Sequence, residues 1–149
     1  MSYHIYQTEG IILGKKDIGE ADRIFSVLTK EFGRIDAVAQ GIRRVESKLR
    51  YSLSTFSYAR LGLVASRTLW RIVDAEELNN WANIHQAPEK LAVVFRIAGL
   101  INRMVKGQEP DTALWEDVKN AFLFLEQHEI NQEERGSQIF ELLTQLRIL

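Results

Sequence analysis

Apolar and polar positions alternate through the first half of the chain, which is the pattern of half-buried β-strands. Over residues 35–40, for example, Ile35, Ala37 and Ala39 fall on one face and the residues between them on the other. The same pattern predicts strands over 3–13, 24–29, 35–40, 56–64 and 68–75. Hairpin turns are expected at 30–33, which ends on a glycine, and at 65–67.

The segment 45–53 separates the third and fourth predicted strands. Leu49 and Leu53 are four residues apart and have Lys48 and Arg50 beside them, which predicts a short helix with one buried and one charged side. Three strands, a helix and two strands form the element order of the OB-fold. Because five short amphipathic strands leave exposed edges unless the sheet closes, we expect a five-stranded barrel.

From about Glu76 the apolar spacing becomes helical. Pro88 suits a first helical turn, and Asp111 or Thr112 can cap a second helix. The three apolar stripes are Leu91, Val94, Phe95, Ala98, Ile101 and Val105, then Leu114, Val118, Phe122 and Leu125, then Ile139, Leu142, Leu143, Leu146 and Leu149. We expect an OB-fold domain over 1–77 and an all-helical domain over 78–149 that packs on it. The third stripe reaches the last residue without a stop signal, so we also expect the chain to be truncated there.

Composition narrows the class of protein. The 149 residues are 46% hydrophobic and 26% charged, with a net charge of −1, as in a globular protein of one or two small domains. The longest apolar runs have five residues, against about 18 for a membrane span. No secretory leader is visible and cysteine is absent, so we expect a cytoplasmic protein without disulfides or cysteine-ligated metals.

The distribution of charge is more informative than its total. Residues 1–73 carry 12 basic and 7 acidic side chains, whereas residues 74–149 carry 7 and 13. The segment 43–71 has a single acid, Glu46, and seven cations: Arg43, Arg44, Lys48, Arg50, Arg60, Arg67 and Arg71. Because arginine and lysine supply charge and directional donors to phosphates, this segment is a candidate polyanion-binding surface.

Aromatic residues lie near these cations. OB-folds hold single strands with cations and stacked aromatic rings. For Phe56 and Trp70 a place in the barrel core is the favoured interpretation, whereas for Tyr51 and Tyr58 base stacking and core packing are equally open.

Catalysis finds little support in the sequence. The glycines match neither a dinucleotide fingerprint nor a P-loop, and no Gly-x-Ser-x-Gly elbow occurs. The three histidines lie at least 43 residues apart and are expected at the surface. Asp17, Glu20 and Asp22 are interleaved with cations in a predicted loop, which is typical of solvated ion pairs. We therefore expect no enzyme, no metal and no cofactor.

Four segments in the first third of the chain are TEGIIL at 8–13, DIGEADRI at 17–24, LTKEFGRI at 28–35 and AVAQGIRR at 37–44. In order and spacing they resemble the N-terminal region of the bacterial recombination-mediator family RecO. The match covers most of residues 8–50, and beyond it the likeness is one of pattern only. The GEADRI run and the Gly-x-Arg-Arg turn are its most specific parts.

The resemblance implies an OB-fold followed by helices in a bacterial cytoplasmic protein that acts at the nucleoid during repair. It further implies binding of single- and double-stranded DNA, annealing of complementary strands, and loading of RecA together with a RecR-type mediator and single-strand-binding protein. The basic residues that match the family's positions are Lys15, Lys16, Arg34, Arg43, Arg44, Lys48 and Arg50. Arg67 and Arg71, from the cationic segment, complete the predicted DNA-binding set.

Two departures and two alternatives remain. Many family members carry a cysteine zinc module after the helices, whereas this chain has no cysteine and stops where the family usually continues. Partner binding by this chain therefore stays open. The first alternative is a protein-interaction adaptor with little DNA affinity, favoured by the acidic second half. The second is an OB-fold RNA binder of the translation machinery.

Overall fold

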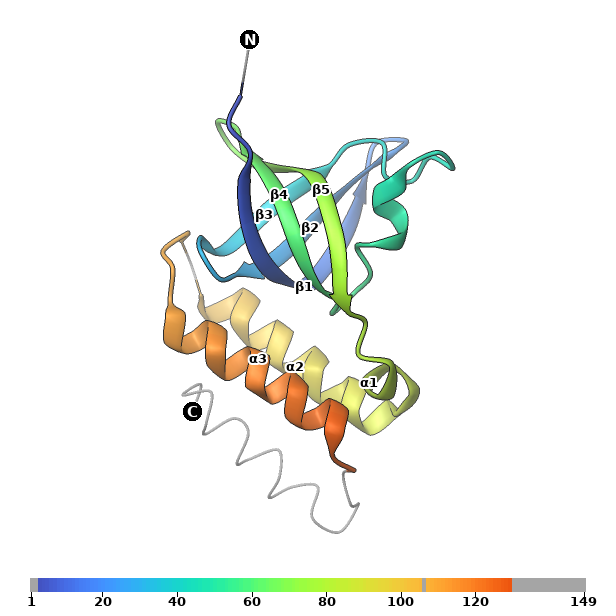
Figure 1. Ribbon diagram of the computed structural model, residues 1–149, viewed down its shortest axis with the longest axis vertical. Coiled ribbons are helices and arrows are strands. Elements are labelled where there is room, and N and C mark those ends of the chain that lie inside the picture. The colour runs from blue at the N-terminus through green and yellow to red at the C-terminus, as the bar shows by residue number, and fades with distance from the viewer. Residues whose placement is uncertain (1–2, 106, 130–149) are drawn as a thin grey trace.

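The computed structural model describes residues 3–105 and 107–129, in which a β-barrel sits on two long helices (Figure 1). The strands are β1 (Tyr6–Ile18), β2 (Asp22–Thr29), β3 (Gly33–Ala39), β4 (Tyr58–Ala65) and β5 (Trp70–Asn79). A short 3-10 turn, η1 (Lys48–Tyr51), lies between β3 and β4, and the helices are α1 (Ala82–Gln86), α2 (Pro88–Met104) and α3 (Thr112–Gln127). The expected fold class, a barrel followed by helices, is confirmed.

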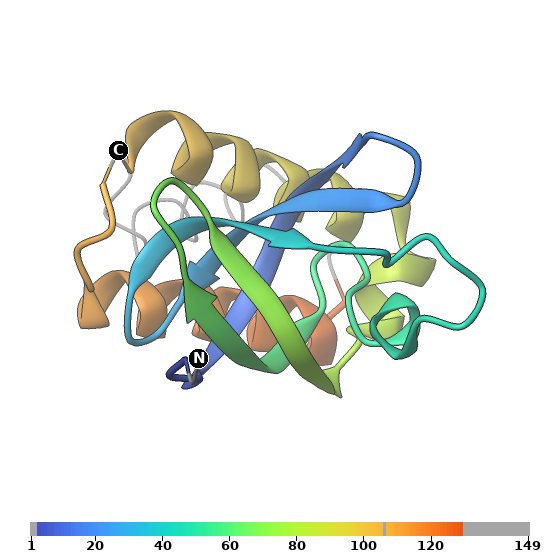
Figure 2. The same ribbon diagram turned by 90° about the horizontal axis from the view of Figure 1, so that it is seen from above.

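The sheet closes on itself in the order β1-β2-β3-β5-β4. β1 pairs antiparallel with both β2 and β4, and β3 pairs parallel with β5. This is a five-stranded OB-type barrel, in which closure leaves no unpaired edge. Seen from above, the barrel lies across α2 and α3 (Figure 2).

The barrel interior is filled by the alternating apolar positions of the strands. On β3, Ile35, Ala37 and Ala39 are fully buried, as their spacing predicts. They pack with Phe25 and Val27 of β2 and with residues of β1, β4 and β5 in one cluster. This cluster is the core of the barrel.

A second core joins the barrel to the helices. Ile11 and Leu13 of β1 and Leu28 of β2 point out of the barrel and pack with buried residues of the helical layer, including Trp81 and Trp115. Because Ile12, between them, faces into the barrel, β1 is apolar on both faces over 11–13. A strand buried on both faces positions the helices against β1 and β2.

Two strands differ from their expected bounds. β1 begins at Tyr6 and continues to Ile18, because residues 14–18 pair with β2 beyond a bulge. Lys15, Lys16 and Asp17, expected after the first strand, therefore lie within it. β5 continues to Asn79 through pairing with β4, so the helical pattern expected from Glu76 was wrong up to that point.

The helix expected over 45–53 was also wrong in extent. Only Lys48–Tyr51 forms a turn, of the 3-10 type. Leu53 is buried in the barrel core and Leu49 packs against it, while Lys48 and Arg50 are exposed. The predicted division into an apolar and a charged side is thus present without the helix, because the loop closes over the barrel.

The helical layer follows the predicted stripes with one exception. Phe95 is 58% exposed, because the buried face of α2 is formed by Val93, Val94, Ile97, Ala98 and Ile101. Asp111 caps α3, as expected, by accepting a hydrogen bond from the backbone of Leu114 at 3.0 Å. The third predicted stripe lies outside the described residues. No helix within the described ranges is long and apolar enough to cross a membrane.

Candidate nucleic-acid interface

The loop that follows β3 is bound to the turn between β1 and β2. The backbone N–H of Gly41 donates to Asp22 Oδ1 at 2.7 Å, and that of Arg43 donates to the Ala21 carbonyl at 3.0 Å. The Arg43 guanidinium donates to the carbonyls of Ile18 and Gly19. In the predicted Gly-x-Arg-Arg turn, Arg43 therefore has a structural role, because its contacts fix the loop to the turn between β1 and β2.

Asp17 joins this network from β1. Its carboxylate accepts a hydrogen bond from Arg23 Nε at 2.6 Å and lies 3.6 Å from Arg43 Nη1. The hydrogen bond from Arg23 is the main reason that the pKa of Asp17 is lowered, and the charge of Arg43 adds to it. Of the acidic cluster, Asp17 thus forms the predicted ion pairs, and Asp22 binds the backbone of Gly41.

A cross-strand row of residues spans the outer face of the barrel. Strand register pairs Lys16 of β1 with Ile24 of β2, Ile24 with Val38 of β3, and Val38 with Arg71 of β5. Register partners share a face, so the row places a cation at each end of two half-buried β-branched side chains. Three strand spacings separate its ends, which is about 14 Å.

Lys15 lies on the other face of β1. Its register partner is Phe25, which is buried in the barrel core, whereas the partner of Lys16 faces outward. Successive strand residues alternate between faces, so the two lysines point to opposite sides of the exposed β1–β2 hairpin. Only Lys16 belongs to the row that reaches Arg71.

The remaining predicted cations divide by whether they have a partner. Among the residues that the structure describes, ion pairs link Arg23 and Arg43 to Asp17, Arg34 to Asp36 and Arg60 to Glu76. Within the same ranges, and with Lys15 set aside because it lies on the other face of β1, six predicted cations make no ion pair: Lys16, Arg44, Lys48, Arg50, Arg67 and Arg71. We call these six the basic surface.

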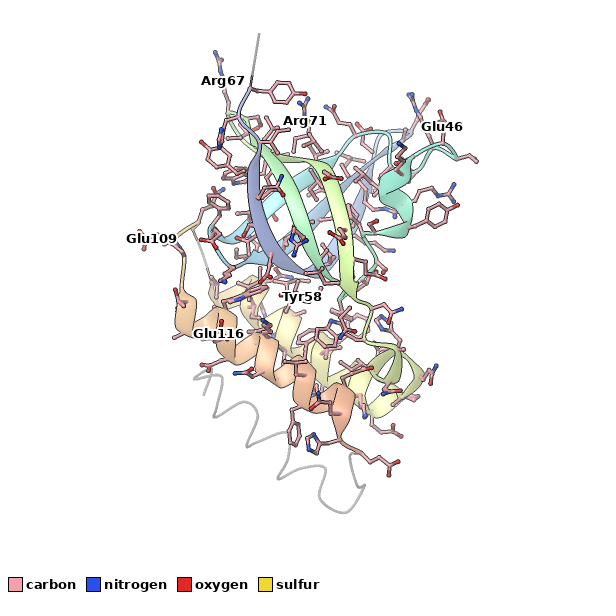
Figure 3. The ribbon with its side chains drawn as sticks, viewed as in Figure 1. Glu46, Tyr58, Arg67, Arg71, Glu109 and Glu116 are labelled. Atoms are coloured by element: carbon pink, nitrogen blue, oxygen red, sulfur yellow. The ribbon has the colours of Figure 1, made fainter. Side chains whose placement is uncertain are left out.

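Two members of the basic surface, Arg67 and Arg71, lie away from the helices. Figure 3 labels Arg67, Arg71 and Glu46, and all three lie at the end of the barrel remote from α2 and α3. Glu109 and Glu116, also labelled, lie on the helical side. Arg67 and Arg71 thus lie at the remote end of the barrel together with Glu46, and the labelled carboxylates Glu109 and Glu116 lie toward the helices.

Arg34 is not part of this surface. Its Nε donates to Asn102 Oδ1 of α2 at 2.9 Å, and its Nη2 lies 3.2 Å from Asp36 Oδ1. Ser26 of β2 donates to the same Asn102 oxygen. The three residues tie the barrel to α2, so Arg34 has a structural role that its sequence position did not reveal.

The four aromatic residues weighed in the sequence occupy different environments. Trp70 packs against the barrel core, as favoured, whereas Phe56 is buried in the second core, between the barrel and the helices, and not in the barrel core that was favoured for it. Tyr51 is 77% exposed, with the guanidinium of Arg50 5.7 Å from its ring centre. Tyr51 is therefore free to stack on a base at the edge of the basic surface.

Tyr58 lies between the barrel and the helices (Figure 3). Its ring centre is 6.2 Å from that of Trp81 and 6.1 Å from that of Trp115, and the Lys119 ammonium lies 5.4 Å from it. Burial, with a contribution from Glu9, raises the pKa of its phenol. Packing accounts for this ring, and it lies apart from the basic surface.

Two exposed tyrosines escaped notice in the sequence. Tyr3 precedes β1 and Tyr6 begins it, and both were counted as part of a predicted strand. In the fold Tyr6 lies beside Trp70 and Tyr3 lies beside Arg71, each more than 60 residues away along the chain. No local pattern reveals that proximity, because it arises only when β1, β4 and β5 pair.

The described residues offer no cluster of metal ligands. Within 3–105 and 107–129, no group of three or more histidine, aspartate or glutamate side chains is placed to hold a metal ion. His4, His85 and His128 are exposed and separate, as expected.

The fold thus defines an OB-type barrel with a cationic end, followed by helices. Residues 1–81 match the family model described as "Recombination protein O N terminal", and the chain belongs to this family. The membership places the chain among DNA repair and recombination proteins.

Curated relatives agree with the family match. Proteins named "DNA repair protein RecO" are 33% identical over 82% of this chain in Gloeothece citriformis and 30% over 84% in Rubrobacter xylanophilus. Another, from Acaryochloris marina, is 36% identical over 74% of the chain. The aligned parts cover 43%, 50% and 38% of these relatives, so the chain spans about two fifths to a half of their length.

Proposed function

We propose that this chain is a non-catalytic DNA-binding part of a recombination mediator, and that it binds single- and double-stranded DNA through the basic surface. The observation that carries the proposal is the set of six cations without ion-pair partners among the described residues. Two of them, Arg67 and Arg71, lie at the end of the barrel remote from the helices (Figure 3). Cations that no carboxylate neutralises are available to phosphates, and their binding releases counterions.

The expected contacts explain why the chain would bind DNA of any sequence, whether single- or double-stranded. Arg44, Lys48 and Arg50 lie on an exposed loop and turn, where long side chains reach phosphates without inserting into a groove. Phosphate contacts position DNA and carry no base information. A surface that holds two strands in this way reduces their mutual repulsion and leaves the bases free to pair, which is the requirement for annealing.

Partners are part of the same proposal. By membership of the family, we infer that the chain acts with a RecR-type mediator and single-strand-binding protein to load RecA on the bacterial nucleoid. Co-elution with each partner on size-exclusion chromatography, with and without DNA, tests this separately from DNA binding.

The decisive experiment is fluorescence anisotropy of a labelled single-stranded oligonucleotide and of a matched duplex, each titrated with the chain at several salt concentrations. If all six cations contact phosphates, the logarithm of the association constant should fall against that of salt with a slope of about −4 for the single strand. An RNA of the same sequence distinguishes the translation-type alternative, because only RNA has a 2′-hydroxyl.

A matched pair of charge reversals locates the contact. Arg44→Glu, on the basic surface, should weaken binding to both DNA forms about tenfold, whereas Arg96→Glu, on an exposed position of α2, should have little effect. Equal effects of the two variants would mean that binding follows net charge only, and absence of binding at low salt would contradict the proposal.

A further inference from the structure

A cluster of aromatic rings closes one end of the barrel. Tyr6 contacts Phe32, from the turn between β2 and β3, and Trp70, from the start of β5, in edge-on geometry with ring centres 5.6 and 5.7 Å apart. Phe32 and Trp70 are 4.9 Å apart, and His4 lies edge-on to Tyr6 at 4.3 Å. Edge-to-face contacts are one of the favoured arrangements of aromatic pairs.

The cluster has an inner and an outer part. Phe32 and Trp70 are half-buried on the barrel core, and the indole N–H of Trp70 donates to Gln108 Oε1 at 3.0 Å. Tyr6 and Tyr3 form the outer part and are 37% and 60% exposed. Packing explains the inner rings, but it does not explain two large aromatic side chains at the surface.

Cations border the exposed rings. The guanidinium of Arg71 lies 5.5 Å from the ring centre of Tyr3, and its buried Nε has no hydrogen-bond partner among the described residues. Arg67 is exposed in the turn before β5, and Figure 3 shows both arginines beside the segment that leads into β1. The backbone of Glu109, the residue after Gln108, lies against Gly33, the neighbour of Phe32.

This arrangement favours a negatively charged ligand with flat apolar groups. The row from Lys16 through Ile24 and Val38 ends on Arg71, so the cations of the basic surface lead to the exposed rings. A chain whose charges repeat and whose planar groups alternate with them suits such a surface better than a peptide with a few carboxylates. Base–aromatic stacking with flanking cations is how proteins hold unpaired strands.

We propose that Tyr3 and Tyr6 form a stacking platform for unpaired bases of single-stranded DNA, with Arg67 and Arg71 holding the adjoining phosphates. The inference rests on the proposed function and deepens it, because it assigns the basic surface a strand-selective part. Duplex DNA keeps its bases stacked on one another, so it gains only the phosphate contacts. The platform therefore gives the barrel a preference for single strands.

The test compares three labelled probes of equal length: oligo(dT), an abasic strand with the same phosphates, and a duplex. Tyr3→Ala, and Tyr6→Leu in a second variant, should weaken oligo(dT) binding about tenfold while leaving abasic and duplex binding unchanged. Tyr3→Phe should bind as the native chain does, because it keeps the ring. Circular dichroism of each variant shows that the barrel is folded.

Tryptophan fluorescence supplies an independent readout. Trp70 lies in the cluster, whereas Trp81 and Trp115 are buried between barrel and helices. Oligo(dT) should quench the native chain more strongly than the abasic strand does, and Trp70→Phe should remove that difference. Equal quenching by the two strands would overturn the platform.

The outcomes separate this inference from the proposed function. If the native chain binds none of the three probes, the proposed function fails and the platform fails with it. If it binds oligo(dT) and the abasic strand equally, and Tyr3→Ala changes neither, the platform alone is overturned. If Tyr3→Ala spares oligo(dT) but abolishes binding of an acidic peptide, the surface belongs to a protein partner and the inference is overturned.

Discussion

On the side of the barrel that faces α2, the side chain of Arg34 bonds to Asp36 and Asn102, whereas at the remote end the side chain of Arg44 makes no ion pair among the described residues. Both arginines belong to the run that resembles the family, and both were predicted to bind DNA. The difference shows that an arginine's role is decided by what the fold brings beside it. Partnered cations hold the molecule together, and unpartnered cations are available to a ligand.

The same contrast between a partnered and an unpartnered position exists for two glycines of the backbone. Replacing them by alanine should have the largest effect on stability. Gly33 and Gly19 both have positive φ, 68° and 57°. A Cβ on Gly33 would collide with the backbone of Glu109, whereas one on Gly19 would meet nothing within 4 Å. Gly33→Ala should therefore cost roughly 3 kcal/mol in the free energy of unfolding and Gly19→Ala about 1 kcal/mol.

Urea unfolding of the two alanine variants measures these costs. Equal losses of stability would mean that the left-handed backbone alone sets the cost. The close contact between the β2–β3 turn and the segment between α2 and α3 would then make no contribution to the cost of the substitution.

Charge reversal at the remote end is expected to have the next largest effect. Lys16→Glu combined with Arg44→Glu changes two exposed cations that have no ion-pair partner among the described residues. Affinity for DNA should fall about 100-fold at constant salt, with stability almost unchanged, because exposed charges contribute little to folding. Fluorescence anisotropy measures the affinity and urea unfolding measures the stability of the same preparation. A variant that loses stability would show that these two cations also hold the fold together, which contradicts the contrast with Arg34.

Single alanine substitutions sharpen the contrast between the two arginines. Arg34→Ala removes one of the two donors to Asn102 Oδ1 and should lower the free energy of unfolding by about 1–2 kcal/mol, with the salt slope of DNA binding unchanged. Arg44→Ala should leave stability within about 0.5 kcal/mol and reduce the salt slope by roughly one. If both variants alter the salt slope equally, Arg34 also contacts DNA.

The smallest expected effect concerns pH and the turn that holds Arg43. The hydrogen bond from Arg23 lowers the pKa of Asp17 below 3.8 in the folded chain. A lowered carboxyl pKa stabilises the fold above the unfolded value, and that contribution is lost as the pH falls through the folded value. Native stability should therefore decline more than that of Asp17→Asn below about pH 4.

Urea midpoints between pH 6 and pH 2.5 measure this difference. Parallel declines in the native chain and in Asp17→Asn would show that the contacts of Asp17 do not contribute to folding. Arg43 would then be held by its backbone acceptors alone.

Much of the fold could be predicted because it depends on local periodicity. The alternation over 35–40 matches the burial of Ile35, Ala37 and Ala39, and the spacing in the helices matches the burial of Val94, Ile101 and Val118. Errors arose where pairing extended an element beyond its pattern. β1 gained residues 14–18 through pairing with β2, and β5 gained residues 76–79 through pairing with β4, although both segments are mostly polar and do not have a strand's apolar alternation.

The residues of the candidate site could be predicted from the sequence, but their arrangement in space could be predicted only in part. The cationic segment supplied Arg44, Lys48, Arg50, Arg67 and Arg71 of the basic surface, and the family resemblance added Lys16. Neither could separate Lys15 from Lys16, because a bulge after Ile12 decides which of them faces the row. Neither could show that Tyr58 is packed between Trp81 and Trp115.

The sequence by itself determined the barrel-then-helix order, the excess of cations in the first half and the membership of a recombination family. These properties follow from residue types and near-neighbour spacing, which the chain carries whether or not it is folded. Tertiary structure decided which cations are neutralised, which aromatic rings stay exposed and which residues form the row from Lys16 to Arg71. The physical reason is that charge pairing, burial and register are contacts between segments distant in sequence, and closure of the barrel creates them.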